Sequence, residues 1–516
     1  MNWTTNRRSF LKATGGGLAG LMATPHFAWA QEGDTLRIRM AGDFQVLDPW
    51  GEIGGLDDVI NRCTTVTLVR ISDMREGSEW ELYAAESLEW QSDTALAFTL
   101  RDGLSWTNGY GPVTAEDVKY SFERIAGSDS AWAYQFEMLD RVEVTGERTG
   151  VIHLTQPFAP FIVTALPYYG GHLVSKAAVE EAGGSFTTEA PAECGPFLFS
   201  SWEQQQKVTL TANPDWTGEA PDFSTIEFYI VEDDQSALLA YEANSFDFTR
   251  VAPSSVNQLH ADMPEGAELI EADSTTYTWL TVNQNAPTLQ DPRVRRAIQL
   301  AYDSEAVLYG AYDGVVGRAA GLVPPGSPYA RESNIYAERD VEQARALLAE
   351  AGAEGLTLNL VALTDSTSQT IAQIIQASLS EAGINVVIQP TEEAAYWSLG
   401  DMTAGDDYLT LELVLQSFAG GVDPTENFVW FRPDQIGVYN WTFFDSPEFE
   451  ELYQASLVEL DETARAGMFN RMEDLMEESG SFVFIAFDPY VAIHDAGIEP
   501  VILADGHPDP VRFSKE

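Results

Sequence analysis

The sequence has 516 residues, of which 80 are Asp or Glu and 28 are Lys or Arg, giving a formal net charge of -52. This acidic excess excludes electrostatic binding of nucleic acid, and 45% hydrophobic residues with 13 Trp exclude a disordered chain. The chain is longer than a single hydrophobic core supports, so we expect two or three domains. Because the Asp and Glu residues are spread along the chain, we interpret them as a solvated acidic surface. Electrostatic attraction of cationic ligands is the alternative interpretation.

The N-terminal segment has the pattern of an export signal. Arg7-Arg8, with the Phe-Leu-Lys that follows, precedes an apolar Gly- and Ala-rich run and then Ala28-Trp29-Ala30, which is typical of a cleavage site. We interpret it as a twin-arginine signal cleaved near Ala30; a basic amphipathic segment is the alternative. No cysteine lies near the cleavage point, so there is no residue to carry a lipid anchor. No later run reaches the roughly 18 consecutive apolar residues that a membrane span needs. We therefore expect a soluble protein of the periplasm, exported by the twin-arginine translocase.

Two cysteines, Cys63 and Cys194, remain after the signal. In an oxidising compartment they could form one disulfide, and two free buried thiols are the alternative. Twin-arginine export usually carries folded protein, so such a bond would not be required for folding.

The first half of the chain contains short strand-like runs and one clear helix. Thr114 to Asp117 resembles a capping box, after which Val118, Phe122 and Ile125 fall on one helical face. The strand-like runs are 88–100, 151–154, 208–210 and 226–231.

The second half contains capped helices and a β-α-β unit. Asp291-Pro292 and Ser446-Pro447 each place a capping residue before a proline at the first helical position. Residues 340–351 read as a helix that ends at Gly352. Between 356 and 388 the apolar pattern changes from alternation to helical spacing and back again. Its first βα turn lacks phosphate-cradling glycines, so no nucleotide site is indicated.

Catalytic motifs are absent from the sequence. There is no nucleophile elbow, zinc-protease motif, Cys-x-x-Cys or phosphate-binding loop, and the histidines are spread singly. With 80 carboxylates, paired acids occur by chance and carry no information. We therefore predict a protein that is not an enzyme and uses no cofactor or metal, although hydrolases without local motifs exist.

Four stretches, in this order along the chain, carry a family resemblance. They are 84–124 with its LRDG and TAEDV motifs, Gly195-Pro196-Phe197 through Asn213-Pro214-Asp215-Trp216, Val282-Asn283 through DPRVRRAIQLAYD, and 347–387 with EAGINV. Together they resemble the extracytoplasmic solute-binding proteins of ABC importers, in the peptide/nickel class called family 5.

The resemblance implies an α/β fold, a periplasmic binding protein-like two-lobed clamshell (type II, cluster C-like) with an extra domain in lobe one. Lobe one is expected at 31–78, 192–278 and 487–516, the extra domain at 79–191, and lobe two at 279–486. The implied function is to capture a small organic solute and deliver it to the permease and ATPase subunits, with a monomer as the family expectation. A periplasmic hydrolase or a chaperone-like protein on the same fold is the alternative.

The resemblance also implies residues that line the cleft. A ligand-facing strand after Leu47-Asp48-Pro49 would place Ile53, Gly54 and Gly55 there. The aromatic candidates, for which a role in the core or at a domain interface is the alternative, are Trp132, Tyr134 and Trp279.

The stretch from Leu415 to Phe431 carries the remaining candidates. Peptide-binding members resemble W-x-x-D-x-x-D-P here, and the first Asp pairs with the α-ammonium of the peptide. This chain has Ser417 at the Trp position and Gly420 at the Asp position, and retains Asp423-Pro424.

The amine anchor is therefore missing, which favours a ligand other than an ordinary peptide: an opine, modified amino acid, glycoside, metal chelate or cationic osmolyte, with a peptide as the family default. Asp423 either substitutes for the anchor or forms a turn. Among the nearby aromatic residues, which include Trp397 and Phe418, we expect one or two to face the cleft and to suit stacking or cation-π contact.

Overall fold

The computed structural model describes residues 34–51, 55–73, 80–128, 130, 132–336, 338–503 and 506–515. The predicted export signal and its cleavage point lie outside the described residues, as do Ile53 and Gly54. Within the described ranges, no helix is long and apolar enough to cross a membrane.

A seven-stranded sheet forms the first large unit, in the order β10-β11-β12-β1-β13-β20-β14. Strand β1 pairs in parallel with β12 and β13, and its alternating Leu36 and Ile38 are fully buried. The strands are β1 Thr35–Met40, β10 Phe197–Glu203, β11 Lys207–Ala212, β12 Thr225–Ile230, β13 Phe248–Arg250, β14 Ala267–Ala272 and β20 Tyr490–Asp495, and the helices beside them are α1 Gly55–Thr64, α5 Asp234–Glu242 and α6 Val256–Ala261.

A five-stranded sheet, in the order β17-β16-β18-β15-β19, forms the second large unit. The strands are β15 Tyr277–Val282, β16 Thr357–Leu363, β17 Asn385–Thr391, β18 Leu413–Phe418 and β19 Phe482–Phe487. The main helices are α7 Pro292–Ala301, α8 Ser304–Tyr312, α9 Val341–Ala351, α10 Ser366–Glu381, α11 Glu393–Gly400, α12 Thr425–Phe428, α13 Pro447–Val458 and α14 Glu462–Glu478. Strands β16 and β17 pair in parallel around α10, which confirms the predicted β-α-β unit.

A four-stranded antiparallel sheet, β4-β5-β9-β8, lies in the region from 80 to 191. The predicted capping box is confirmed, since the Thr114 N–H donates to the Asp117 carboxylate at 2.9 Å at the start of helix α2. The run 88–100, predicted as one strand, is part of a hairpin, because residues 93–94 form a tight turn. The elements are β4 Ala85–Ser92, β5 Ala95–Leu100, β8 Leu139–Val144, β9 Thr149–Leu154, α2 Ala115–Ala126, α3 Phe161–Thr164 and α4 Lys176–Glu181.

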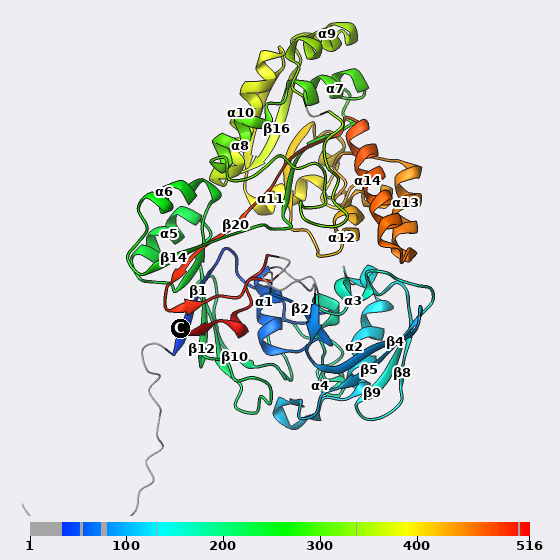
Figure 1. The fold of residues 1–516 in the computed structure, drawn as a ribbon, viewed down its shortest axis with the longest axis vertical. Helices are drawn as coiled ribbons and strands as arrows, with labels where there is room; N and C mark the ends of the chain where they lie inside the picture. Colours follow the sequence, from blue (N-terminus) through cyan, green and yellow to red (C-terminus); the bar gives the residue numbers. More distant parts are fainter. Residues whose placement is uncertain are drawn as a thin grey trace, which may run out of the picture.

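The three sheets occupy three corners of the molecule (Figure 1). The five-stranded sheet and its helices lie at the top, the seven-stranded sheet at the lower left, and the four-stranded sheet at the lower right. The chain passes between the two larger sheets twice, from β14 to β15 through residues 273–276 and from β19 to β20 through 488–489. The architecture is therefore a two-lobed α/β fold with a double crossover.

Hydrogen bonds join the two crossover segments. The Asp488 N–H donates to the Thr276 carbonyl at 2.8 Å, and the Ser274 hydroxyl donates to the Asp488 carbonyl at 2.6 Å. The Asp488 carboxylate accepts hydrogen bonds from the hydroxyls of Tyr312, at 2.6 Å, and Thr278, at 3.1 Å. The backbone between the lobes is thus held as one bonded pair of segments.

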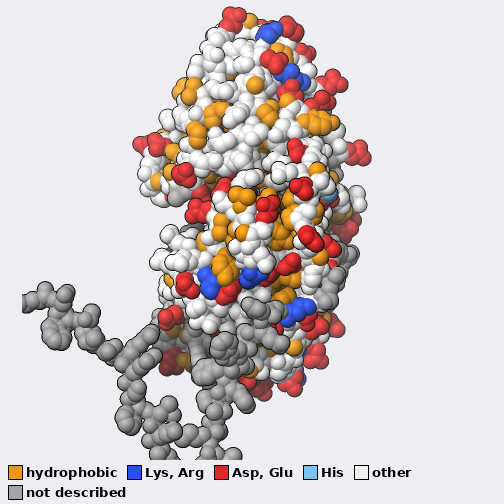
Figure 2. All heavy atoms as spheres, turned by 90° about the vertical axis from the view of Figure 1, so that its left-hand side faces the viewer, with side chains coloured by type: hydrophobic (Ala, Val, Ile, Leu, Met, Phe, Trp, Pro, Cys, Tyr) orange, Lys and Arg blue, Asp and Glu red, His pale blue; other side chains and the backbone are white. Residues whose placement is uncertain are grey.

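The sequence leaves open whether the acidic residues serve as a solvated surface or attract cationic ligands, and whether Cys63 and Cys194 form a disulfide or stay as free thiols. Acidic side chains are spread along the visible face of the molecule, with few Lys or Arg side chains among them (Figure 2). Cys63 and Cys194 are buried free thiols. Burial raises the pKa of both thiols, which keeps them protonated and unreactive.

Candidate functional site

A cavity of about 790 Å³ lies between lobe two and the segment that carries Trp132. It is lined by the end of β18, by α11 and the turn after it, and by residues 430, 438 and 439. The aromatic lining residues are Trp132, Trp397, Phe418, Trp430 and Tyr439. The others are Ser398, Asp401, Met402, Thr403, Ser417, Ala419 and Val438.

The aromatic rings of lobe two pack against one another around the cavity. The ring centroids of Trp397 and Phe418 are 5.9 Å apart and those of Trp430 and Tyr439 are 5.0 Å apart. Tyr439 meets Phe418 edge-on at 6.0 Å. Such contacts stabilise a rigid apolar wall before any ligand is present.

Strand β18 and helix α11 position the lobe-two residues. Residues 413–416 are buried in the sheet, so the strand reaches the surface at Ser417 and Phe418. The Tyr396 hydroxyl donates to the Leu415 carbonyl at 2.8 Å, which joins α11 to β18 and places the neighbouring Trp397 beside Phe418. Ser417, Phe418 and Trp397, all predicted from the sequence, are therefore brought together.

Trp132 reaches the cavity from the opposite part of the molecule. It precedes the short helix η2, Ala133–Phe136, and its ring stacks on Tyr169 at 3.7 Å with an interplanar angle of 7°. Its indole N–H has no hydrogen-bond partner among the described residues.

The predicted Tyr134 does not line the cavity but joins the two parts of the molecule beside it. Its hydroxyl donates to Glu426 of α12 at 2.9 Å, and its ring meets Trp430 edge-on at 5.9 Å. Burial raises the pKa of Glu426 to about 7.

The placement of Trp279 on the cleft wall is wrong. Trp279 on β15 is fully buried, and its indole N–H donates to the Thr281 hydroxyl at 2.9 Å. Phe418 packs edge-on over it at 4.8 Å and separates it from the cavity. Trp279 therefore supports the lining residue Phe418. Its own strand, β15, lies next to β18 and is buried along its whole length.

Asp423 is a structural residue rather than an available ligand anchor. Its two carboxylate oxygens each accept a hydrogen bond from Arg465 at 3.0 Å, and one also accepts the Thr425 N–H at 2.9 Å. Asp423 is 6% exposed and Arg465 is 4% exposed, so the pair is neutralised within the core. Of the two interpretations of Asp423, the structure supports the turn.

Gly420, predicted to stand at the position of the missing amine anchor, lies against the crossover backbone. A Cβ atom at Gly420 would lie 2.4 Å from the Thr275 carbonyl oxygen, and the Thr275 hydroxyl donates to the Gly420 carbonyl at 2.6 Å. Glycine is present because the crossover backbone occupies the space that a side chain would need. Gly55 begins helix α1, and its place in the cleft stays a prediction.

A series of hydrogen bonds holds the turn that follows β18. The side-chain amide of Asn427 donates to the Leu322 carbonyl at 2.7 Å and its oxygen accepts the Gly421 N–H at 3.0 Å. Leu322 N–H in turn donates to Glu473 of α14 at 2.7 Å.

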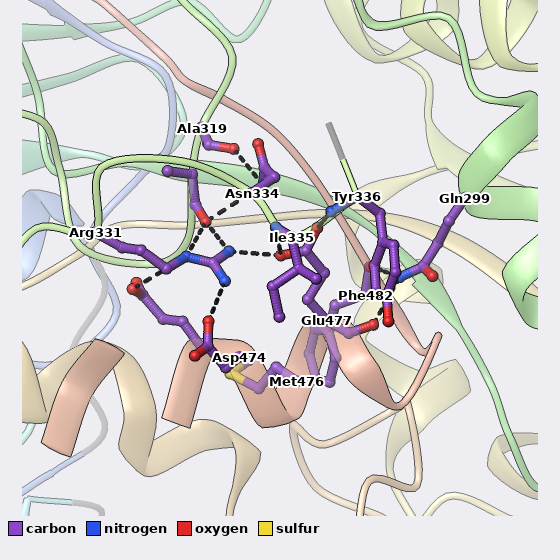
Figure 3. Close-up of polar contacts among 12 residues, drawn as sticks. Gln299, Ala319, Arg331, Asn334, Ile335, Tyr336, Asp474, Met476, Glu477 and Phe482 are labelled. Atoms are coloured by element: carbon purple, nitrogen blue, oxygen red, sulfur yellow. Dashed lines mark hydrogen bonds and ion pairs between the residues drawn. The ribbon is translucent and has the colours of Figure 1, made fainter. Parts of the chain in front are cut away.

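The loop that contains Leu322 is itself fixed by Arg331. Figure 3 shows the guanidinium of Arg331 reaching Asp474 and Glu477 of α14, each at 2.8 Å. Helix α14 therefore holds the α8–α9 loop, and this loop holds the turn next to the cavity.

The sequence did not single out Asp401 or Tyr439. Asp401-Met402-Thr403 follows α11, and its carboxylate accepts the Thr403 N–H at 2.7 Å. Its Asp-x-Thr spacing predicts a turn, but nothing in the spacing shows that the turn borders a cavity. Of the other aromatic residues nearby, Phe428, Phe431 and Trp441 are buried.

A second cavity, of about 620 Å³, lies at the crossover. Residues of β14 and the segment after it line one side, with Glu271 and Asp273 among them, and Val315, Pro324 and Phe487 line the other. It has a single aromatic residue among its described lining, so it is the less suited to enclose an organic solute.

Comparisons with known proteins agree with this architecture. The chain matches the family described as bacterial extracellular solute-binding proteins, family 5 Middle, over residues 79–434. It is 26% identical over 464 residues to the probable D,D-dipeptide-binding periplasmic protein DdpA of Escherichia coli (strain K12), covering 88% of each chain.

Solved structures share the fold at lower identity. The dipeptide binding protein from Pseudoalteromonas sp. SM9913 in complex with Met-Leu has a TM-score of 0.83 at 18% identity, covering 93% of this chain and 100% of that chain. MoaA from A. tumefaciens R10 in complex with mannopinic acid has a TM-score of 0.81 at 22% identity, covering 94% of this chain and 99% of that chain. The two-lobed periplasmic binding protein fold predicted from the sequence is confirmed. The chain belongs to family 5 of the bacterial extracellular solute-binding proteins and has the substrate-binding role of that family.

Proposed function

We propose that this protein is the periplasmic substrate-binding component of an ABC importer and that it encloses a small organic solute in the cavity beside Trp132 and Trp397. The observation that carries the proposal is the origin of the cavity wall. Trp132 comes from the segment 79–191, whereas Trp397 and Phe418 come from lobe two. A wall assembled from two parts of a hinged molecule encloses a ligand when the parts close.

The proposed domains follow the sheets and the crossover. Lobe one comprises 31–78, 192–278 and 487–516, the extra domain is 79–191, and lobe two is 279–486. The segments 273–276 and 488–489 act as the hinge. The closed molecule delivers its solute to permease and ATPase subunits, as a monomer exported through the twin-arginine route.

Relatives support a peptide-like solute as the starting class. The E. coli relative is a probable D,D-dipeptide-binding protein, and a 22% identical relative from Bacillus subtilis is an oligopeptide-binding protein. The ordinary amine anchor is absent at Gly420 and Asp423 is paired with Arg465. The solute is therefore bound by other contacts, chiefly the aromatic wall.

Two tryptophan variants test the site. The protein is incubated with defined mixtures of dipeptides and amino-acid derivatives, retained solutes are identified by mass spectrometry, and affinity for a retained solute is measured by calorimetry. Trp397→Ala is expected to weaken binding by about 1 to 3 kcal/mol, because Trp397 lies on the cavity wall, and to lower stability less than Trp279→Ala does, because Trp397 is only partly buried.

Trp279→Ala is the matched control. It is expected to lower the free energy of unfolding by about 3 to 5 kcal/mol, because Trp279 is fully buried, and to change affinity less than Trp397→Ala does. Equal affinity of Trp397→Ala and the unmodified protein would contradict the proposed site.

A further inference from the structure

We propose that the solute bound in this cavity carries an organic cation, namely a protonated amine, a guanidinium or a quaternary ammonium group, on an apolar body. The inference rests on the proposed function and names the chemical class of its ligand. It follows from the charge of the cavity wall, the charge behind the wall and the aromatic rings.

The wall carries one negatively charged side chain, which has no ion-pair partner among the described residues. Asp401 is the one charged residue among the described lining residues, which include neither Lys nor Arg. Its carboxylate accepts the N–H and the hydroxyl of Thr403, at 2.7 and 2.9 Å, and these donors are neutral. The Thr403 donors are the polar partners of the Asp401 carboxylate within the described ranges, and none of them is charged. A ligand that neutralises this carboxylate must bring its own positive charge.

A second carboxylate lies behind the wall at the hinge. The Ser417 hydroxyl, which lines the cavity, is 3.4 Å from the Asp488 carboxylate. Among the described residues, the hydrogen bonds to the Asp488 carboxylate come from the neutral hydroxyls of Tyr312, Thr278 and Ser417.

Arg250 acts on Asp488 through its charge, but its guanidinium packs over the Tyr490 ring, 4.9 Å from the centroid. Burial raises the pKa of Asp488, so a cation near Ser417 would stabilise its ionised form. An anionic group in the cavity would instead face both Asp401 and Asp488.

The aromatic residues provide the complementary surface for a cation on an apolar body. Four rings of lobe two pack together on one side of the cavity, and Trp132 lies on the other. Aromatic rings attract organic cations through their quadrupoles and bury apolar groups at the same time. The described lining residues include no Arg or Lys, the side chains that would form an ion pair with a ligand carboxylate or phosphate.

Charge over the whole molecule does not account for selectivity by itself. A net charge of -52 raises the local concentration of every cation, whatever its shape. The cavity must therefore be tested with probes that differ in charge but not in shape, and with variants that remove one acid at the cavity or one elsewhere.

The experiment uses two matched pairs of probes in equilibrium titrations at fixed ionic strength. Choline is compared with 3,3-dimethylbutan-1-ol, its neutral isostere, and N-acetylarginine amide is compared with N-acetylcitrulline amide. At least one cationic probe is expected to bind about 10-fold or more tightly than its neutral partner. Asp401→Asn is expected to reduce this preference by about 3- to 10-fold.

The charge control is Asp102→Asn. Asp102 is exposed, caps its own turn by accepting the Gly103 N–H at 3.0 Å, and is not among the described lining residues. The Asp102→Asn substitution changes the net charge by the same amount as Asp401→Asn. It is expected to leave the preference for the cationic probe over its neutral partner unchanged. Equal effects of the two variants, or equal binding of charged and neutral probes, would overturn the inference.

The outcome separates this inference from the proposed function. If the protein binds neutral or anionic solutes in a manner that Trp397→Ala weakens, and binds neither cationic probe, the cation assignment is overturned and the proposed function stands. If no solute binds, or if binding is insensitive to Trp397→Ala, the proposed function fails and the inference fails with it.

Discussion

Two Asp-x-Thr turns of lobe two have almost the same local geometry and opposite surroundings. In Asp423-Pro424-Thr425 and in Asp401-Met402-Thr403, the Asp carboxylate accepts both the N–H and the hydroxyl of the Thr. Asp423 lies in the core and pairs with Arg465 through both oxygens. Asp401 borders the large cavity without an ion pair among the described residues.

The Asp-x-Thr pattern sets the hydrogen bonds within each turn, and the surrounding residues decide whether the charge of the Asp is neutralised. The local sequence fixes how each Asp bonds to its own turn, which is why turn residues can be recognised in a sequence. Whether the remaining charge is neutralised depends on a residue from another helix. An acid that stabilises the fold and an acid that faces a solute can therefore share one short pattern.

The largest expected effect concerns the buried pair. Asp423→Asn should lower the free energy of unfolding by about 3 to 5 kcal/mol, because it leaves the buried Arg465 guanidinium without its anion. Asp401→Asn should change it by less than about 1 kcal/mol, since the side chain is half-exposed and an amide oxygen still accepts from Thr403. Urea unfolding of both variants measures the difference, and similar losses for the two would break the comparison.

The Gly420 turn gives the next effect. Gly420→Ala should destabilise the protein by about 1 to 3 kcal/mol, because the added Cβ would lie 2.4 Å from the Thr275 carbonyl oxygen. Gly467→Ala within α14 is the control, since nothing lies within 4 Å of its Cβ position.

There the substitution should stabilise the protein by about 0.5 to 1 kcal/mol through helix propensity. Thermal unfolding of the two variants compares them. Unchanged stability of Gly420→Ala would show that the crossover backbone shifts to accommodate a side chain at this position.

The contact between Tyr134 and Glu426 gives a pH-dependent effect of about 1 to 3 kcal/mol. Burial raises the Glu426 pKa from 4.5 to about 7, so the folded state holds this proton where the unfolded state has lost it. The stability due to this group is complete below its unfolded pKa and is lost as the pH rises through about 7.

Glu426→Gln keeps an acceptor for the Tyr134 hydroxyl and removes the titration. The variant should therefore lose less stability than the unmodified protein between pH 5 and pH 8, as measured by urea unfolding at each pH. Burial raises the pKa values of Glu193 and Glu473 to about 7 as well, so the difference between the two proteins isolates Glu426. Parallel pH profiles would show that Glu426 does not titrate in this range.

Local patterns predicted the elements well. The capping box at Thr114, the cap at Asp291 and the β-α-β unit at 357–391 were all predicted from short-range spacing, and all are present. These features depend on bonds within a few residues or on a simple periodicity, which a sequence contains directly.

The site was predicted less completely, because exposure depends on distant parts of the chain. Trp397, Phe418 and Trp132 were named and line the cavity, whereas Trp279 is covered by Phe418 from the neighbouring strand. The sequence shows that Gly420 carries no acid, but nothing in its own stretch reveals that the backbone of Thr275 lies against it. Asp401 was missed because its turn resembles many surface turns.

A crystal structure of the protein with a retained solute tests the central claim most directly. We predict electron density for the solute between Trp132 and the rings of Trp397 and Phe418, with a cationic group of the solute close to Asp401. Density in the crossover cavity beside Glu271 and Asp273, with the aromatic cavity empty, would contradict the account.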